Sequence, residues 1–356
     1  MFWGFAFGAD RTVRVSNELS RLLTRRGLLV SHDVCEPVQI RKNPAAGRIC
    51  KPRGVERHMQ MTVTSEEPSL STPVGGRGVF ARNISMSDPF RITEPTCISF
   101  SGGRTSAYML WRVLQSNNGL PDDAIVCFAN TGKEEEATLE FVRDCEKHWG
   151  VEIHWVEYRN ADPSFERVNF STASRNGEPF EALIVKRSYL PNPVTRFCTS
   201  ELKIRTIHKY LKSLEWDHNE TSDWVGIRAD EARRAAKIDR SRTPLVAAGI
   251  TVHDVNKFWS KQSFNLNLPT YQGRTLAGNC DLCYLKPANQ IFTLIKEKPE
   301  RAIWWAKMEA LALASKPSGA RFRKDRAGYA EMLKFSEQQT DMFSDDEEAM
   351  ACFCGD

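Results

Sequence analysis

The chain has 356 residues, enough for one large domain or two small ones, and its 41% hydrophobic and 26% charged residues are ordinary for a soluble globular protein. No apolar run approaches the roughly 20 residues that span a bilayer, so we expect a cytoplasmic protein with no membrane partner. The net charge of +4 is concentrated in residues 1–90, which hold 13 Lys and Arg against 8 Asp and Glu. Bulk charge therefore gives no strong case for nucleic-acid binding by the rest of the chain.

Along the chain, residues 1–90 have weak periodicity and frequent Gly, Pro and Ser, which predicts a poorly ordered basic extension. A regular alternation then begins, and we expect an α/β domain over residues 91–290. Its predicted strands are 97–100, 124–129, 151–156 and 223–227, and its predicted helices are 105–114, 133–149 and 199–213. Helices at 286–297 and 300–315 lead into a C-terminal helical region and cysteine-containing tail, residues 291–356. Alternating strands and helices of these lengths imply right-handed crossovers and a parallel sheet.

The first strand is followed by Ser101-Gly102-Gly103-Arg104-Thr105-Ser106, which opens the first helix. Glycines let the backbone turn tightly and approach a phosphate, and the first N–H groups of a helix attract anions. The hydroxyls of Ser101, Thr105 and Ser106 can donate further bonds. A plain tight turn with a serine cap would explain the Ser-Gly-Gly run alone, but the position at the first crossover favours a phosphate loop.

This loop resembles the Ser-Gly-Gly-x-Asp-Ser pyrophosphate loop of the adenine-nucleotide α-hydrolase superfamily, which includes ATP pyrophosphatases and phosphoadenosine phosphosulfate reductases. Three later segments are similar to that family in the same order: Phe128 to Lys133, Arg196 to Lys203, and Gly226 to Arg234. The pattern is close to that of DNA phosphorothioation-type sulfurtransferases. The resemblance implies a parallel-sheet, Rossmann-like domain of the HUP type. Thr105 stands where the family has Asp.

The resemblance also implies a nucleotide site. It would bind ATP or phosphoadenosine phosphosulfate through Ser101, Gly102, Gly103, Thr105, Ser106, Asn130, Thr131, Gly226, Arg228 and Arg233. Lys203 and Arg228 would stabilise charge on the leaving group. Arg228 follows an apolar strand at the carboxyl edge of the sheet, which suits a phosphate or sulfate contact. Asp230 and Glu231 either hold Mg²⁺ or orient the arginines, and each basic residue here has the alternative of being a solvated surface charge.

The ten cysteines lack the spacing of a secreted disulfide framework. Three of them, Cys97, Cys127 and Cys145, lie in apolar patterns and are expected in the core. Five lie in polar or loop-like contexts: Cys198, Cys280, Cys283, Cys352 and Cys354. In a reducing compartment such a group indicates metal or redox chemistry.

The proposed ligand set is Cys198, Cys280, Cys283 and Cys354. Spacing alone does not separate zinc from an iron–sulfur cluster, and the family resemblance favours [4Fe–4S]. Alternatively, Cys280 to Cys283 is a small structural knuckle and the terminal cysteines are free. Cys352 or Cys354 is also a candidate nucleophile, because reductases of this family use a cysteine on a C-terminal tail.

The expected function is that of an adenine-nucleotide-dependent enzyme of sulfur metabolism. One version transfers an adenylyl group with release of pyrophosphate, and another reduces a sulfonucleotide with Cys354 as nucleophile. The acceptor would be sulfate, a nucleic acid or a small metabolite, and the candidate partners besides the nucleotide are a nucleic acid and a sulfur-donor protein. The alternative is a non-catalytic nucleotide- or nucleic-acid-binding module, supported by Thr105 in the loop.

Overall fold

The computed structural model describes residues 88–217, 219–271 and 274–338. Its central feature is a five-stranded sheet with the order β4-β3-β2-β1-β5, in which β4 is antiparallel and the other strands are parallel. The strands are β1 (Thr96–Ser99), β2 (Ala124–Asn130), β3 (His154–Tyr158), β4 (Phe165–Val168) and β5 (Ser222–Val225). The prediction of an α/β fold with a largely parallel sheet is confirmed, and the antiparallel edge strand β4 was not predicted.

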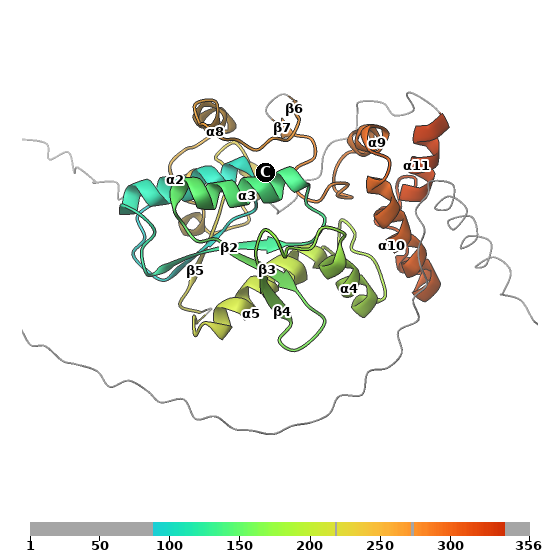
Figure 1. Ribbon diagram of the computed structural model, residues 1–356, viewed down its shortest axis with the longest axis horizontal. Coiled ribbons are helices and arrows are strands. Elements are labelled where there is room, and N and C mark those ends of the chain that lie inside the picture. Colours follow the sequence, from blue (N-terminus) through green and yellow to red (C-terminus); the bar gives the residue numbers. More distant parts are fainter. Residues whose placement is uncertain (1–87, 218, 272–273, 339–356) are drawn as a thin grey trace, which may run out of the picture. The chain divides into compact units, whose positions relative to one another are not determined.

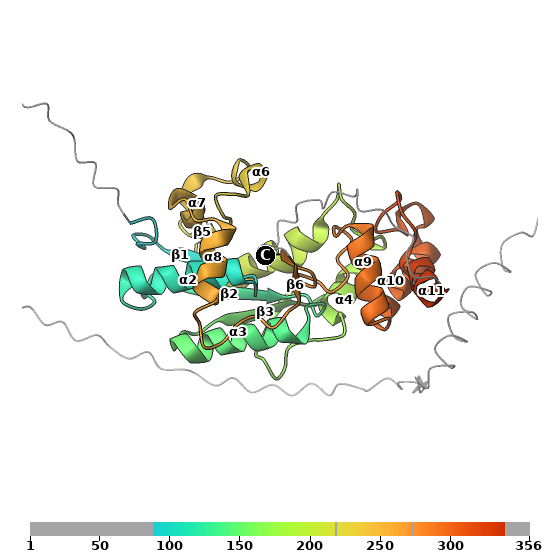
Figure 2. The same cartoon turned by 90° about the horizontal axis from the view of Figure 1, so that it is seen from above.

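Helices cover both faces of this sheet (Figures 1 and 2). On one face lie α2 (Arg104–Asn117) and α3 (Glu136–Trp149), and on the other lies α5 (Thr206–Ser213). Each of the crossovers from β1 to β2 and from β2 to β3 contains one helix, as parallel neighbours require. The chain then reaches β5 on the opposite side of β1, so β1 lies in the interior of the sheet.

Side chains alternate between the two faces along the buried strands. The face under α2 and α3 presents Ile98, Val126, Phe128 and Trp155. The face on α5 presents Cys97, Ile125, Cys127 and Val156. The predicted core positions of Cys97, Cys127 and Cys145 are confirmed, because each has 0% exposure. A hydrogen bond with Cys127 and burial both raise the pKa of the Cys97 thiol, which therefore stays protonated.

Three further helices form the C-terminal part: α9 (Ala288–Glu297), α10 (Arg301–Ser315) and α11 (Tyr329–Gln338). They pack on one another, and α10 also contacts α4 (Glu178–Arg187). Both figures show them grouped beside α4. Aromatic rings fill their interior, with Trp305 against Phe322 and Tyr329. The two helices predicted here are confirmed to within two residues, whereas α4 and α11 were not predicted.

Other elements differ in detail from the sequence expectation. The predicted helix 199–213 is a π-helix, η1 (Cys198–Arg205), that continues directly into α5. A single-turn or short π-helix is often found at functional sites. The strand predicted at residues 151–156 lies later in the structure, as β3 (His154–Tyr158). Short elements complete the fold: α6 (Ala232–Ala235), η2 (Arg240–Arg242), α7 (Pro244–Ala247), α8 (Val252–Trp259), β6 (Thr270–Tyr271), β7 (Arg274–Thr275) and η3 (Pro317–Gly319).

Most of the predicted extension 1–90, together with Cys352 and Cys354, lies outside the described residues. Positions 88–90 of that extension belong to the folded domain, because Phe90 is fully buried. Asn117 Nδ2 donates a 2.9 Å hydrogen bond to the Phe90 carbonyl, and its Oδ1 accepts one from Ile92 N. In the part of the chain that the structure describes, none of the helices has the length and apolarity needed to span a membrane.

Candidate functional site

Polar segments gather where the strand order changes direction, at the carboxyl ends of β1 and β5. The chain leaves β1 for β2 on one side, while β5 lies on the other side. In open α/β sheets ligands bind outside the carboxyl ends of the strands at such a switch point. The segment that joins β1 to α2 and the segment that follows β5 therefore define the place to look for a site.

The segment after β1 is held by its own hydroxyls. Ser106 Oγ accepts a 3.1 Å hydrogen bond from Ser101 N and lies 3.0 Å from the Gly103 carbonyl, to which it donates. Gly102 has a φ of 80°, and a Cβ there would lie 2.7 Å from Thr138 Cγ2 of α3. The loop therefore needs glycine at 102, as a phosphate loop would. The Ser106 hydroxyl, expected to bind phosphate, closes the loop in this structure.

The segment after β5 approaches this loop closely. A Cβ at Gly226 would lie 2.9 Å from Ser106 Cα, so only glycine lets β5 and the start of α2 meet in this way. Two residues later, Arg228 Nη1 donates a 2.9 Å hydrogen bond to Thr105 Oγ1. The Arg228 side chain is 13% exposed. Thr105, which replaces an Asp of the similar family, thus positions the arginine expected to contact phosphate.

Two acidic residues hold Arg228 from the other side. Asp230 Oδ1 accepts from Arg228 Nε at 3.2 Å and from Val252 N at 3.0 Å. Glu231 Oε2 accepts from Arg228 N at 2.9 Å and also lies 3.8 Å from Arg228 Nη1. Both carboxylates orient Arg228 through these contacts, and their alternative role as Mg²⁺ ligands stays a prediction.

The neighbouring arginines differ in their surroundings. Arg233 on α6, expected to contact the nucleotide, is exposed. Arg234 is 7% exposed and forms an ion pair with Glu231. Its Nε is buried and has no hydrogen-bond partner among the described residues. The segment thus has one arginine facing solvent and one packed inside.

The loop after β2 is built around two of its own side chains. Asn130 is fully buried, and its Nδ2 donates to Glu157 Oε1 at 2.6 Å and to the Ser174 carbonyl at 2.9 Å. Thr131 is also buried, and both its N–H and its hydroxyl donate to Glu134 Oε2, at 3.0 Å and 2.8 Å. Both residues were expected to bind the nucleotide, and in this structure their side chains fix the loop.

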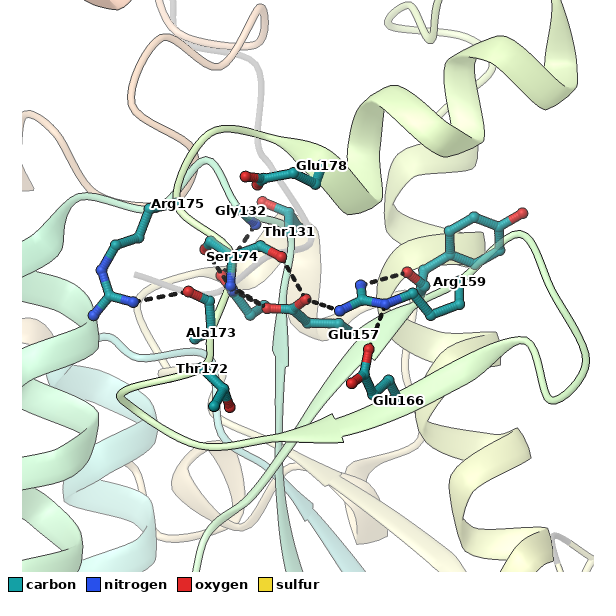
Figure 3. A network of polar contacts seen from close by, with 12 residues as sticks. Thr131, Gly132, Glu157, Arg159, Glu166, Thr172, Ala173, Ser174, Arg175 and Glu178 are labelled. Carbon is teal, nitrogen blue, oxygen red and sulfur yellow. Dashed lines mark hydrogen bonds and ion pairs between the residues drawn. The ribbon is translucent and has the colours of Figure 1, made fainter. Parts of the chain in front are cut away.

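A buried carboxylate that sequence reasoning missed organises the end of β3 (Figure 3). Glu157 has 0% exposure and accepts from Ser174 N and Ser174 Oγ, each at 2.7 Å. Its Oε2 also lies 2.7 Å from Arg159 Nη2. Burial lowers the pKa of Arg159, but its hydrogen bonds to Glu157 and Glu166 outweigh this and raise it. The signal in the sequence was a Glu directly after the apolar pair Trp155-Val156 of this strand.

A cavity of about 590 Å³ adjoins this network. Its walls come from the end of β3, the segment 172–176 and the first turns of α4. Arg175, one of its lining residues, already binds Glu136 and the Ala173 carbonyl, as Figure 3 shows for the latter. The guanidinium groups around this cavity therefore have protein partners.

Residues 276–287, between β7 and α9, contain Cys280 and Cys283 and are called the cysteine loop; this loop contacts the segments that follow β1 and β2. Asp281 N donates to the Lys133 carbonyl at 2.7 Å, and Glu134 pairs with Cys280 in an antiparallel bridge. Lys133 Nζ and Asp281 Oδ2 form a 2.9 Å ion pair in which both side chains are 9% exposed. Trp305 Nε1 of α10 donates to Asp281 Oδ1 at 2.8 Å. The loop after β2, the cysteine loop and the C-terminal helices thus meet at one buried carboxylate.

The same loop also borders the glycine loop after β1, which was expected to hold phosphate. A small cavity is lined by Ser101, Gly102, Gly103 and Thr138 on one side and by Leu266, Thr275, Gly278 and Asn279 on the other. Asn279 has a φ of 61° and directly precedes Cys280. The structure therefore places the first cysteine of the knuckle next to the segment expected to hold phosphate.

The expected ligand cysteines lie on neighbouring segments. Cys198 Sγ at the start of η1 is 3.3 Å from the hydroxyl of Tyr284, the residue after Cys283. Cys280 Sγ is 3.5 Å from Thr131 Oγ1, and Cys283 is 8% exposed. Among the described residues, no three His, Cys, Asp or Glu side chains are arranged as a metal-ligand group. Cys354 lies outside the described residues.

Lys203, the expected catalytic lysine, faces the loop after β2. Its Nζ lies 3.8 Å from Glu134 Oε1, and the Glu134 side chain is 2% exposed. Glu134 Oε1 has no hydrogen-bond partner among the residues that the structure describes. Sequence reasoning missed Glu134, Lys133 and Asp281, although charged residues directly after a buried strand and between two cysteines were a visible signal.

These segments define an α/β protein whose polar residues converge at the carboxyl edge of a mostly parallel sheet. No protein-family model matches the chain. It is 31% identical over 209 residues to the uncharacterized nin region protein ORF290 of Escherichia phage lambda, a match that covers 56% of this chain and 69% of the phage protein. The chain belongs to the family of this phage protein. It is also 28% identical over 229 residues to the uncharacterized protein MJ0066 of Methanocaldococcus jannaschii, covering 62% of this chain and 42% of that protein.

Proposed function

We propose that this protein is an adenine-nucleotide-dependent enzyme of the pyrophosphate-loop ATP pyrophosphatase kind, with a HUP-type domain, acting in sulfur metabolism. The observation that carries the proposal is the 2.9 Å hydrogen bond between Arg228 and Thr105. It joins the glycine loop after β1 to the segment after β5, so a helix N-terminus and a partly buried guanidinium come together at the switch point. Both features favour a phosphate chain.

In the favoured reaction, ATP binds with its phosphates at the start of α2. An oxygen of the acceptor attacks the α-phosphorus, a new P–O bond forms, and the bond to the β-phosphate oxygen breaks to release pyrophosphate. The adenylated acceptor is then open to attack by a sulfur nucleophile. Arg228 and Lys203 would stabilise the charge that develops on the leaving pyrophosphate, and Mg²⁺ would accompany the phosphates.

The cysteines Cys198, Cys280, Cys283 and Cys354 remain the proposed ligands of a [4Fe–4S] cluster, with zinc as the alternative. Thiolates suit both, and the contact between Cys198 and Tyr284 brings the η1 cysteine to the Cys280–Cys283 loop. Such a cluster would supply electrons or hold sulfur beside the nucleotide. Asp281 fixes the loop through Lys133 and Trp305, so the chain holds two of the proposed ligands in place.

A second candidate is reduction of a bound sulfonucleotide. The observation in its favour is that Gly278 and Asn279 line a cavity with the glycine loop, so a cysteine segment, that of Cys280, borders the expected phosphate site. The thiolate of Cys354 would bond to the sulfonate sulfur while the bond to the nucleotide phosphate oxygen breaks, leaving an S-sulfocysteine and a nucleotide product. Arg228 would hold the sulfonate.

The test is pyrophosphate release from ATP by the full chain, purified without oxygen, in the presence of candidate acceptors. The proposal expects release that Arg228→Ala abolishes, whereas Arg323→Ala, which removes an arginine of the C-terminal part paired with Asp325, leaves it unchanged. Nucleotide binding without turnover of ATP or a sulfonucleotide would contradict the enzyme and favour the non-catalytic binding module. Iron, sulfide and zinc analysis of the same sample, with an ultraviolet–visible spectrum, decides between cluster and zinc.

A further inference from the structure

We infer that Glu134 reads the base of the bound nucleotide by accepting a hydrogen bond from an exocyclic amino group. This inference rests on the proposed adenine-nucleotide function and names the residue that would distinguish an amino-bearing base from an oxo-bearing one. Glu134 directly follows the loop after β2 and precedes α3, within the site already described.

The two oxygens of the Glu134 carboxylate have different surroundings. Oε2 accepts from Thr131 N at 3.0 Å, from Thr131 Oγ1 at 2.8 Å and from Lys133 N at 3.3 Å. Oε1 is buried and has no hydrogen-bond partner among the described residues. A buried acceptor without a donor is costly, and a bound ligand with an N–H group would supply the donor.

The charge around Oε1 favours a neutral donor over a cation. Lys203 Nζ, 3.8 Å away, balances the carboxylate charge but is too distant to donate a hydrogen bond. A metal ion at Oε1 would lie beside this ammonium group and be repelled by it. An amino N–H carries no net charge and would donate a hydrogen bond to Oε1.

The position of Glu134 suits contact with a nucleotide at the phosphate loop. Thr138, in the first turn of α3 and four residues after Glu134, lines the small cavity with Ser101, Gly102 and Gly103. Cys280 pairs with Glu134 and follows Asn279, which lines the same cavity. Glu134 is therefore a neighbour of residues that line this cavity, and we place the base of a nucleotide bound at the glycine loop against its Oε1.

The test compares binding of ATP and ITP, which differ in having an amino or an oxo group at the same ring carbon. We expect the unaltered protein to bind ATP about tenfold more tightly than ITP by equilibrium dialysis with magnesium. In Glu134→Gln the three donors of the loop will hold the amide oxygen at the Oε2 position. The amide NH₂ then takes the Oε1 position, and a donor there should equalise or reverse the preference.

Glu135→Gln is the matched control, because Glu135 pairs with Arg301 at 2.7 Å and should leave the ratio unchanged. An unchanged ATP-to-ITP ratio in Glu134→Gln, or equal binding of both by the unaltered protein, would overturn the inference alone. The comparison of ATP and ITP binding by the unaltered protein needs no variant, so it tests the inference even if Glu134→Gln does not fold. Binding of neither nucleotide would overturn the proposed function and this inference together.

Discussion

The phosphate-loop side and the cysteine-loop side of the site are built in different ways. On the first side, backbone geometry decides the arrangement: Gly102 turns the chain, Ser106 closes the loop, and Gly226, from a segment far along the chain, lets β5 approach α2. On the second side, contacts between distant parts of the chain hold the structure. Lys133, Asp281 and Trp305 belong to three separate segments and meet in a buried interior.

The two sides therefore depend on different features: the first on the shape of the backbone, and the second on a buried ion pair. A glycine loop after a strand is specified by a few consecutive residues, because the backbone itself supplies the N–H groups. A buried ion pair is stable only when both partners and their hydrogen bonds are present. We therefore expect changes on the cysteine side to cost fold stability and changes on the phosphate side to cost ligand binding.

The largest expected effect is on the cysteine side, for Asp281→Asn. The variant leaves Lys133 buried without a charge partner, which we expect to lower the free energy of unfolding by about 3 kcal/mol. Urea unfolding followed by tryptophan fluorescence measures this. The control Glu181→Gln breaks an exposed pair with Lys307 and should cost about 0.5 kcal/mol. Similar small losses in both variants would show that the ion pair does not anchor the loop.

A smaller loss is expected for Gly102→Ala on the phosphate side. The φ of 80° and the 2.7 Å approach to Thr138 should together cost about 2 kcal/mol of unfolding free energy and abolish nucleotide binding. Gly150→Ala is matched in backbone, with a φ of 60° and open space around the Cβ, and should cost about 1 kcal/mol. If the two variants are equally stable and both bind nucleotide, the close packing of the loop is not required.

Thr105→Val should affect binding and leave stability nearly unchanged. It removes the acceptor for Arg228 while keeping the side-chain shape, and we expect ATP to bind about tenfold more weakly. Thr105→Ser keeps the hydroxyl and should restore binding. Full affinity in Thr105→Val, measured by calorimetry, would show that Arg228 does not depend on this bond.

The smallest effect concerns pH and the helices behind the cysteine loop. Burial raises the pKa of Glu309 on α10 to about 7 from the ordinary 4.5. Between these values the folded protein holds a proton that the unfolded chain has released, so stability should fall as pH rises from 4.5 to 7. Glu309→Gln should remove this slope and be about 1 kcal/mol more stable at pH 8.

The control for this slope is Glu331→Gln. The hydrogen bond with Arg321 lowers the pKa of Glu331. The stability that Glu331 contributes is therefore lost as pH falls, which is opposite to the trend expected for Glu309. Thermal unfolding from pH 4 to 8 follows both variants. A slope in Glu309→Gln equal to that of the unaltered protein would assign the pH dependence to another group.

Much of the central sheet was predictable because its strands are buried on both faces. Val126 and Phe128 face one core cluster and Ile125 and Cys127 the other, so β2 is apolar throughout. The edge strand β4 was missed because its burial is partial, and its Glu166 and Arg167 are exposed. Short elements after β5 carry too little periodicity to be predicted.

The site was predictable in its segments and less so in its side-chain roles. The glycine loop was expected from consecutive residues, whereas the contact of Arg228 with Thr105 joins positions 123 residues apart. Asn130 and Thr131 were expected to face a ligand, yet their bonds go to Glu157 and Glu134. Those partners lie 27 and 3 residues away, and the sequence does not say which polar side chains the fold brings together.

The position of Asp281 between Cys280 and Cys283 gives a criterion for comparing sequences. Its carboxylate accepts from Leu282 N and Trp305 Nε1 on Oδ1 and binds Lys133 on Oδ2, so it is more than a spacer in a Cys-x-x-Cys motif. A relative that lacks the acid at this position should also lack the lysine that corresponds to Lys133 and the tryptophan that corresponds to Trp305. Covariation of these three positions would separate chains that anchor the cysteine loop in this way from chains that only share the cysteines.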